Sequence, residues 1–225
     1  VDRHKILGIK TIGIVSGAGS YFHFYGVSVV GSMISPLFAP LFDDKNQIDI
    51  RSWRLDDYIA EQAGNLLRGH YDIRPVTYDW KVFAEAWNDE QLSNLARKQF
   101  AGQNLDAYVV VAPVATALGL STRTIGGFGL MENGNGLAGY EDQLYALYKI
   151  TVVDGHSFAI LGSYGATTGD DGIRVHGPNK YVDHQLYKDF TTGGFAAHRP
   201  EIDADLRSLI SSSLPLTLKA VGLTD

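Results

Sequence analysis

Hydrophobic residues in the second half of the chain gather in segments of strand length. The segments 105–111, 121–130, 144–153 and 157–161 are rich in β-branched and aromatic residues, and each has the length of a strand. The pair Asp154-Gly155 lies between the last two segments and is typical of a tight hairpin turn. We therefore predict a β-meander from Leu105 to Gly162.

Helical periodicity precedes and follows this meander. Asn88 with Gln91 three residues later resembles a capping box, so a helix is predicted to begin there and to end at Gly102. A helix is also expected after Pro200, with Pro215 starting a second short helix or an extended tail. The remaining predicted helices are residues 55–68 and 80–87.

Three further strands are predicted in the first half of the chain. Residues 11–16 and 21–30 are rich in β-branched and aromatic side chains, and the glycine-containing segment 17–20 between them is typical of a hairpin connection. Residues 71–78 also alternate, but Pro75 removes a backbone donor. This third strand is therefore expected at a sheet edge or at a bulge.

The segment from Thr11 to Phe42 contains no Asp, Glu, Lys or Arg. A membrane span needs ~20 predominantly apolar residues, but five glycines, two prolines and five serines interrupt this segment. Residues 32–42 are instead predicted to form an apolar loop, which either packs over the core or faces a partner subunit or a membrane surface. The proposed contact residues are Leu37, Phe38, Leu41 and Phe42, together with Phe128 from a glycine-rich hairpin arm at 126–139.

Residues 167–200 are polar, rich in glycine and without clear periodicity. Long loops of this kind are usually functional or disordered. Asp170 and Asp171 suit a hard cation, and His176 lies close in sequence. The spacing matches no compact metal motif, so a solvated polar loop is the main interpretation and a ligand loop the alternative.

Composition narrows the possible functions. The chain has 225 residues and a net charge of −6 with scattered basic residues, which argues against a nucleic-acid surface. It has no cysteine, which excludes disulfides and Cys-ligated metal centres. Because the first residue is Val1 and not Met, an N-terminal piece is expected to have been removed, either as a signal or lipoprotein leader or by deliberate shortening of the chain.

Catalytic motifs are weak. The run Gly17-Ala18-Gly19 after an apolar strand is reminiscent of a dinucleotide fingerprint, but Phe22 stands where the third glycine belongs and the following residues favour a strand. No serine lies in Gly-x-Ser-x-Gly, and Ser163 directly follows a glycine instead. We therefore predict a non-enzymatic protein without a cofactor.

The order of elements resembles a group of bacterial envelope proteins that includes the curli-secretion lipoprotein, the lipoprotein activators of penicillin-binding proteins and the TolB N-terminal domain. The strand Leu105-Asp106-Ala107-Tyr108-Val109-Val110-Val111 matches the "gaD-Y-V-V-V" strand of that group. The hairpin after Val153 matches its "V-D-x-x-T-G" turn less well, because Ser157 and Phe158 occupy the threonine and glycine positions. The resemblance covers residues 10–166 and transfers no catalytic residue.

Together these patterns predict one α+β domain, with a core at 10–166 and a helical segment at 201–222. The sheet is expected to have about five or six mostly antiparallel strands, with helices on one face. The resemblance implies an exported protein, periplasmic or associated with the outer membrane, that acts through a protein partner or self-association. Any membrane contact would be made through a lost N-terminal anchor. The alternative function is a protein that binds a small molecule or a metal, or hydrolyses a substrate, through residues 167–198. The alternative location is the cytoplasm.

Overall fold

A computed structural model describes residues 1–28, 47–84, 86, 88–117, 124–135, 139–140, 142–168, 177–191 and 194–225. The strands are β1 (Thr11–Ser16), β2 (Tyr21–Ser28), β3 (Gln47–Asp49), β4 (Asp72–Arg74), β5 (Ala107–Pro113), β6 (Ala115–Ala117), β7 (Thr124–Asn135), β8 (Gly139–Tyr140), β9 (Asp142–Asp154), β10 (Ile160–Gly165) and β11 (Asn179–Val182). The helices are α1 (Arg3–Ile6), the 3-10 turn η2 (Arg51–Trp53), α3 (Leu55–Leu67), α4 (Trp80–Ala84), α5 (Asp89–Phe100), α6 (His184–Thr191) and α7 (Phe195–Ala220).

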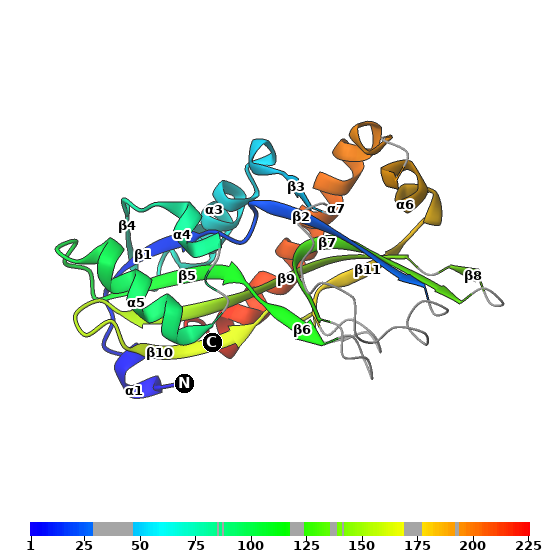
Figure 1. Ribbon diagram of the computed structural model, residues 1–225. Coiled ribbons are helices and arrows are strands. Elements are labelled where there is room, and N and C mark those ends of the chain that lie inside the picture. Colours follow the sequence, from blue (N-terminus) through cyan, green and yellow to red (C-terminus); the bar gives the residue numbers. More distant parts are fainter. Residues whose placement is uncertain are drawn as a thin grey trace.

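The sheet is built around β9, the longest buried strand (Figure 1). The half of β9 near Asp154 lies between β5 and β10, whereas the half near Asp142 lies between β7 and β11. The strand order is β3-β2-β7-β9-β5-β1-β4. The predicted strands at 105–111 and 144–153 correspond to β5 and β9, and the described part of 121–130 lies in β7. The predicted strand 157–161 is misplaced, because β10 begins only at Ile160. The predicted meander order is wrong as well, because β9 lies between β5 and β7 and pairs with both.

The expected hairpin between the first two strands is wrong. β1 pairs in parallel with β4 and β5 in one half of the sheet. β2 pairs with β3 and, in parallel, with β7 in the other half. Residues 17–20 therefore carry the chain from one half of the sheet to the other (Figure 1). The predicted edge strand around Pro75 is confirmed as the shorter strand β4.

The fold is α+β, as predicted, but the sheet is larger and more mixed than expected. The described residues form 11 strands, and the pairs β1–β4, β1–β5 and β2–β7 are parallel. Sequence spacing shows the segments that form strands but not their partners, because pairing between distant segments depends on the whole fold. The predicted count of five or six was therefore too low.

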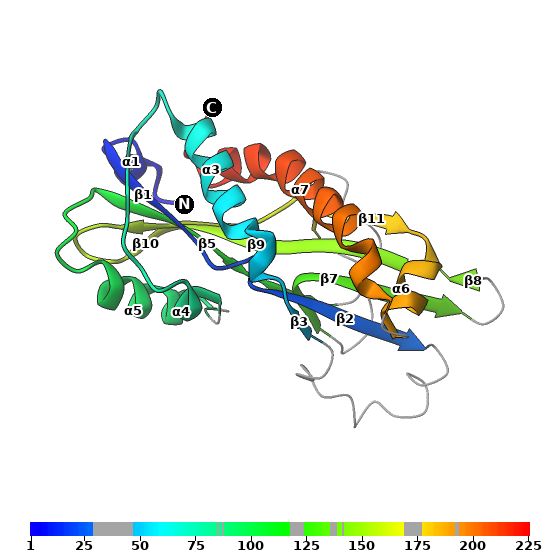
Figure 2. The same ribbon diagram turned by 90° about the horizontal axis from the view of Figure 1, so that it is seen from above.

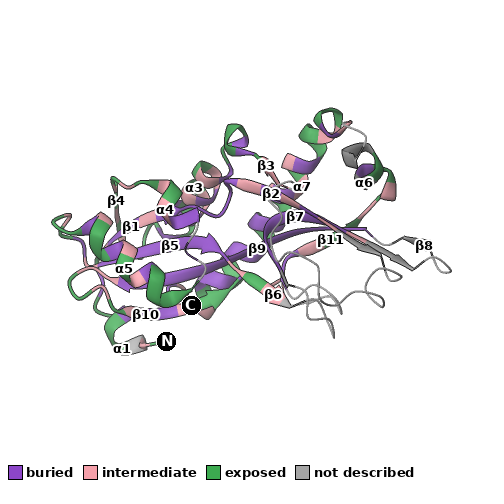
Figure 3. Ribbon diagram, viewed as in Figure 1, coloured by how far each residue is buried: buried purple, intermediate pink, exposed green. Residues whose placement is uncertain are grey.

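Helices cover both faces of the sheet, not one (Figure 2). Ala107, Val109 and Val111 of β5 belong to the core cluster that includes α3 and α7. The intervening Tyr108 and Val110 pack with α4 and α5 on the opposite face. The continuous apolar run of β5 is typical of a strand that is buried on both sides, as the burial colours of Figure 3 show for β5 and β9.

The region predicted as a long polar loop contains regular structure. Residues 177–191 include β11 and α6, and α7 begins at Phe195, before Pro200. α7 also continues through Pro215, although proline removes a helical hydrogen bond. Packing compensates for this loss, because one face of α7 is buried and the Ser213 hydroxyl lies 2.7 Å from the Tyr148 hydroxyl of β9.

The predicted helices at 55–68 and after Asn88 are confirmed as α3 and α5. The Asn88 side chain accepts a hydrogen bond from the Gln91 backbone N–H at 2.9 Å, as the capping box requires. Lys149 of β9 is buried and donates to the Asp89 carboxylate at 2.7 Å. This ion pair attaches the first turn of α5 to the central strand.

Asp106, the acidic residue of the family-like strand, is structural. Its carboxylate accepts hydrogen bonds from the backbone N–H groups of Thr11 at 2.8 Å and Lys10 at 2.9 Å, and these bonds hold its pKa below the ordinary value. The Asp106 N–H donates in return to the Thr11 hydroxyl at 3.0 Å. The start of β5 is thus fixed to the start of β1.

Phe158 lies in the hairpin between β9 and β10, in a backbone conformation that glycine adopts more readily. Phe158 adopts φ 59°, the left-handed region that favours glycine. Its N–H donates to the Asp154 carbonyl at 3.0 Å, and its carbonyl accepts from the Ser93 hydroxyl at 2.7 Å. Partial burial of the Phe158 ring offsets the backbone strain.

Replacing Gly155 with alanine should destabilise the fold by about 2–3 kcal/mol, in the range of overpacking substitutions. A Cβ at this position would lie 1.8 Å from the Leu105 carbonyl oxygen, so the backbone must move. Gly165→Ala is the matched control, because a Cβ there meets nothing within 4 Å. Urea denaturation measures both, and equal stabilities of the two variants would contradict this packing.

The Phe158→Gly variant should have a free energy of unfolding about 0.5–1 kcal/mol higher than Phe158→Ala, because alanine retains the strain of the left-handed backbone. Chemical denaturation of Phe158→Gly and Phe158→Ala gives this difference without the lost ring packing, which both share. At position 159 of the same hairpin the order should be reversed, so that Ala159→Gly is less stable than the wild type. The interpretation fails if alanine is preferred at both positions.

Candidate functional site

Most of the residues proposed from the sequence lie outside the described residues. This applies to the apolar loop residues and to the alternative ligand loop, namely Leu37, Phe38, Leu41, Phe42, Asp170, Asp171 and His176. Phe128 is described, and its side chain is fully buried in the main core cluster. It alternates with the glycines of β7 and faces inward, so Phe128 cannot form an exposed contact surface.

The glycine-rich segment after β1 passes between two helices. A Cβ on Gly17 would lie 2.8 Å from the backbone nitrogen of Ala84 in α4. A Cβ on Gly19 would lie 2.8 Å from the Cβ of Leu55 in α3. Both glycines are thus explained by close helix packing, and the rejection of a dinucleotide site agrees with the strand β2 that follows.

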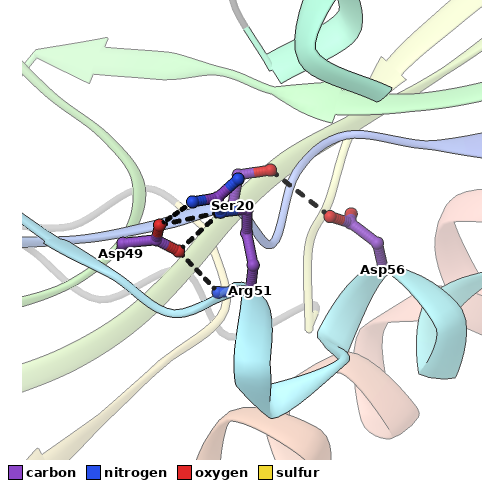
Figure 4. Close-up of polar contacts among 4 residues, drawn as sticks. All are labelled: Ser20, Asp49, Arg51 and Asp56. Carbon is purple, nitrogen blue, oxygen red and sulfur yellow. Dashed lines mark hydrogen bonds and ion pairs between the residues drawn. The ribbon is translucent and has the colours of Figure 1, made fainter. Parts of the chain in front are cut away.

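Asp56, in the first turn of α3, fills the position that an anion would take in this segment. Its Oδ1 accepts hydrogen bonds from the Ser16 hydroxyl at 2.6 Å and the Gly19 N–H at 3.0 Å. The Ser20 hydroxyl lies 3.5 Å from Oδ2 (Figure 4). A carboxylate is favourable at a helix N-terminus, so the chain supplies its own anion here.

Burial raises the pKa of Asp56 above its ordinary value, and the hydrogen bonds from Ser16, Gly19 and Ser20 offset this effect only in part. No described Lys, Arg or His forms an ion pair with Asp56. A desolvated carboxylate without a counter-ion is a perturbed group of the kind that gathers at functional sites.

Asp56 lines a cavity of about 310 Å³, which we call the Asp56 cleft. Its polar and aromatic walls are formed mainly by Gly19, Arg51, Arg54, Asp56, Tyr78 and Trp80. The size is at the lower end of the range for small-molecule sites. The cleft lies where the chain crosses between the two halves of the sheet.

The two arginines of the cleft already have carboxylate partners. The Nε of Arg51 donates to both oxygens of Asp49, at 2.8 Å and 2.7 Å (Figure 4). This pair lowers the pKa of Asp49. The Nε of Arg54 donates to Asp57 at 2.6 Å. Both pairs are local in sequence and largely exposed, so each contributes little to stability.

The aromatic walls of the cleft are Tyr78 and Trp80. The Tyr78 hydroxyl lies 3.3 Å from both the backbone N and the carbonyl of Ser16, and burial raises its pKa. The guanidinium of Arg51 lies 5.2 Å from the centre of the Trp80 ring, and the Lys81 ammonium lies 5.9 Å from it. Both distances are within the range of cation–π contacts.

A second candidate is the edge of the sheet beyond β9, formed by β10 and β11 in succession. We call it the outer edge. Both strands pair with β9, and no other described strand pairs with their outer sides. Tyr164 is 45% exposed and Tyr181 is 63% exposed. The Asp2 N–H donates to the Leu161 carbonyl of β10 at 2.6 Å. Beyond this contact no described strand covers the edge, and exposed tyrosines there are suited to protein contact.

Polar groups of the late segment have structural roles where they are described. The Asp183 carboxylate accepts from the Gln185 N–H at 2.8 Å at the start of α6. The Nδ1 of His184 lies 3.0 Å from the buried Asp142 carboxylate. Among the described residues, no group of three or more His, Asp or Glu side chains could hold a metal ion.

No helix in the described part of the chain is long and apolar enough to cross a membrane. No protein-family model matches the chain, and no curated protein matches its sequence.

Several solved structures of bacterial proteins are similar over most of their length. A protein described as a neuraminyllactose-binding hemagglutinin homolog from Helicobacter pylori has a TM-score of 0.33 and 9% identity, covering 88% of this chain and 86% of that one. PelC from Paraburkholderia phytofirmans, solved as a dodecamer, has a TM-score of 0.29 and 13% identity over 94% and 89%. Lipoprotein GNA1162 from Neisseria meningitidis has a TM-score of 0.29 and 13% identity over 85% and 99%. These scores are too low to assign a family or a function.

Sequence reasoning missed the Asp56 cleft because its parts are far apart in the chain. Asp56 lies inside the predicted helix 55–68 and carries no functional motif in the sequence. The glycines near it were interpreted as a hairpin connection. The sequence offers one signal for the cleft, namely that the polar residues Ser16, Ser20 and Tyr78 lie at or beside the ends of predicted strands. Only the fold brings these three residues close to Asp56.

The raised pKa of Asp56 makes a prediction about stability and pH. The folded state holds the proton more tightly than the unfolded state, whose Asp pKa is about 3.9. The free energy of unfolding should therefore decrease as pH rises from that value to the higher folded pKa. Asp56→Asn should lose this decrease, and urea denaturation between about pH 3 and pH 7 measures it.

The expected result is that the stability of the wild type relative to Asp56→Asn is greatest at the acidic end. Asn65→Ala, which removes an exposed polar side chain from the same helix, should keep the wild-type pH dependence. A relative stability that rises with pH would show that the folded pKa of Asp56 is lowered instead.

Proposed function

We propose that this chain is a non-catalytic binding protein of the bacterial cell envelope that acts through protein contacts. The observation that carries the proposal is the outer edge with its exposed Tyr164 and Tyr181. Edge strands offer unpaired backbone groups to another chain, and tyrosine provides contact area at a small loss of side-chain entropy.

The structural use of the polar groups supports a binding role over catalysis. Asp106 and Asp154 both serve as acceptors for backbone N–H groups, and Lys149 is paired with Asp89. The envelope location rests on the resemblance of the strand 105–111 and its hairpin to the lipoprotein group. Fractionation of the native host, with detection of the full-length protein in the envelope or the cytoplasm, tests that part.

A second copy of the chain is the partner we propose for the outer edge. Two identical edges can pair about a twofold axis, which gives each copy the same new backbone hydrogen bonds. Charge does not oppose this pairing, because the basic residue of β11, Lys180, is already bonded to Asp205 at 2.7 Å. The apolar residues Leu37, Phe38, Leu41 and Phe42 remain a proposed additional contact surface.

Tyr164→Ser combined with Tyr181→Ser should weaken self-association at least about tenfold, because exposed tyrosines at interface centres commonly contribute 1 kcal/mol or more each. Sedimentation velocity over a concentration series measures the dissociation constant. Leu66→Ser, a partly exposed position on α3, is the control and should leave it unchanged.

Phe38→Ser with Phe42→Ser tests the second surface in the same experiment. A weakened dimer in this variant alone would move the interface from the outer edge to residues 32–42. A wild type that stays monomeric at the highest attainable concentration would contradict self-association.

A further inference from the structure

Of the two carboxylates that line the Asp56 cleft, Asp57 is paired with an arginine and Asp56 is not. Arg51 is bonded to Asp49 and Arg54 to Asp57. Asp56 is the third carboxylate of this neighbourhood, and its hydrogen-bond donors are all uncharged. A cation that enters the cleft would supply the missing charge, and the partial burial of Asp56 would strengthen the attraction.

The hydrogen bonds of Asp56 restrict the kind of cation. Oδ1 already accepts two hydrogen bonds, from Ser16 and Gly19, and Ser20 approaches Oδ2. The carboxylate therefore has a full charge to offer but few free acceptor positions. A quaternary ammonium needs charge and contact area without donating hydrogen bonds, whereas a primary amine or a guanidinium needs acceptors.

The aromatic walls of the cleft suit a cation that donates no hydrogen bonds. Two of the chain's own cations, Arg51 and Lys81, lie within cation–π distance of the Trp80 ring. Lys81 is exposed at the surface and can give up its position. Recognition of quaternary ammonium groups by aromatic rings is a well-established binding mode.

An anionic ligand fits the same cleft poorly. The N-terminus of α3 and the N–H of Gly19 would attract an anion, but Asp56 occupies that position. The guanidinium groups that could bind phosphate or carboxylate are already paired with Asp49 and Asp57. An anion would therefore have to approach Asp56 itself and the carboxylates that already neutralise both guanidinium groups.

We propose that the Asp56 cleft binds a small quaternary ammonium compound of about the size of choline, with Asp56 as the counter-ion and Trp80 and Tyr78 as the aromatic walls. The cavity of about 310 Å³ accommodates such a molecule. This site is separate from the outer edge, so it does not depend on self-association.

The test is a titration of the full chain with choline chloride, followed by isothermal calorimetry and by the indole N–H signal of Trp80 in NMR spectra. The paired probe is 3,3-dimethyl-1-butanol, which has the same shape without the charge. Choline should bind and shift the Trp80 signal, and the neutral compound should bind at least about tenfold more weakly. Absence of choline binding, or equal binding of both compounds, would overturn the proposal.

Two variants separate the roles of charge and ring. Asp56→Asn and Trp80→Ala should each weaken choline binding at least about tenfold. Asp72→Asn removes an exposed carboxylate that pairs with Arg74 outside the cleft, and it should bind like the wild type. Because Trp80 is only half-buried, its variant remains informative if Asp56→Asn proves unstable.

The pH dependence of choline binding gives a further test. Choline binding should weaken as the pH falls through the raised pKa of Asp56, because protonation removes the counter-ion. Binding that stays constant across this range, or that persists in both variants, would place the cation elsewhere on the protein.

Discussion

The structure depends on β9 being hydrogen-bonded on both edges along nearly its whole length. One half of the strand joins β5 to β10 and the other half joins β7 to β11. Buried backbone groups must be paired, so a strand buried from Asp142 to Val153 requires partners on both sides throughout. No described strand pairs with β9 along its whole length: β5 pairs with residues 148–154 and β7 with residues 143–147. The sheet is therefore assembled in two halves that share β9.

This division explains the path of the first strands. β1 belongs to the half of β5, and β2 belongs to the half of β7, so the chain must cross between them within residues 17–20. The crossing lies between α3 and α4, and only glycine allows the backbone to approach both helices. The space left at the crossing is the Asp56 cleft. The candidate site is thus a consequence of how the sheet is divided.

The sequence was informative about local structure because local causes determine it. The apolar run at 105–111, the capping pair Asn88 and Gln91, and the turn at Asp154-Gly155 each act within a few residues. The structure confirms the strand and the helix start, and the chain reverses after Asp154, although the reversal extends to Ala159. Partners of strands were not predictable, because β1 with β5 and β2 with β7 are joined across about a hundred residues. The start of α7 was missed for a related reason. Pro200 is usually a sign of a helix start, yet packing extends this helix back to Phe195.

The charges of the Asp56 cleft also differ in whether their partners are local or distant in sequence. The pairs Asp49–Arg51 and Arg54–Asp57 are two and three residues apart, so they would form transiently even in a short peptide. Asp56 is bound by groups 36 to 40 residues away, and only the folded chain holds it in a partly desolvated position. A carboxylate kept desolvated by the fold is preorganised for a cation, because part of the cost of removing water from it has already been met during folding. This preorganisation distinguishes Asp56 from the exposed carboxylates of the surface, whose water would have to be displaced at the moment of binding.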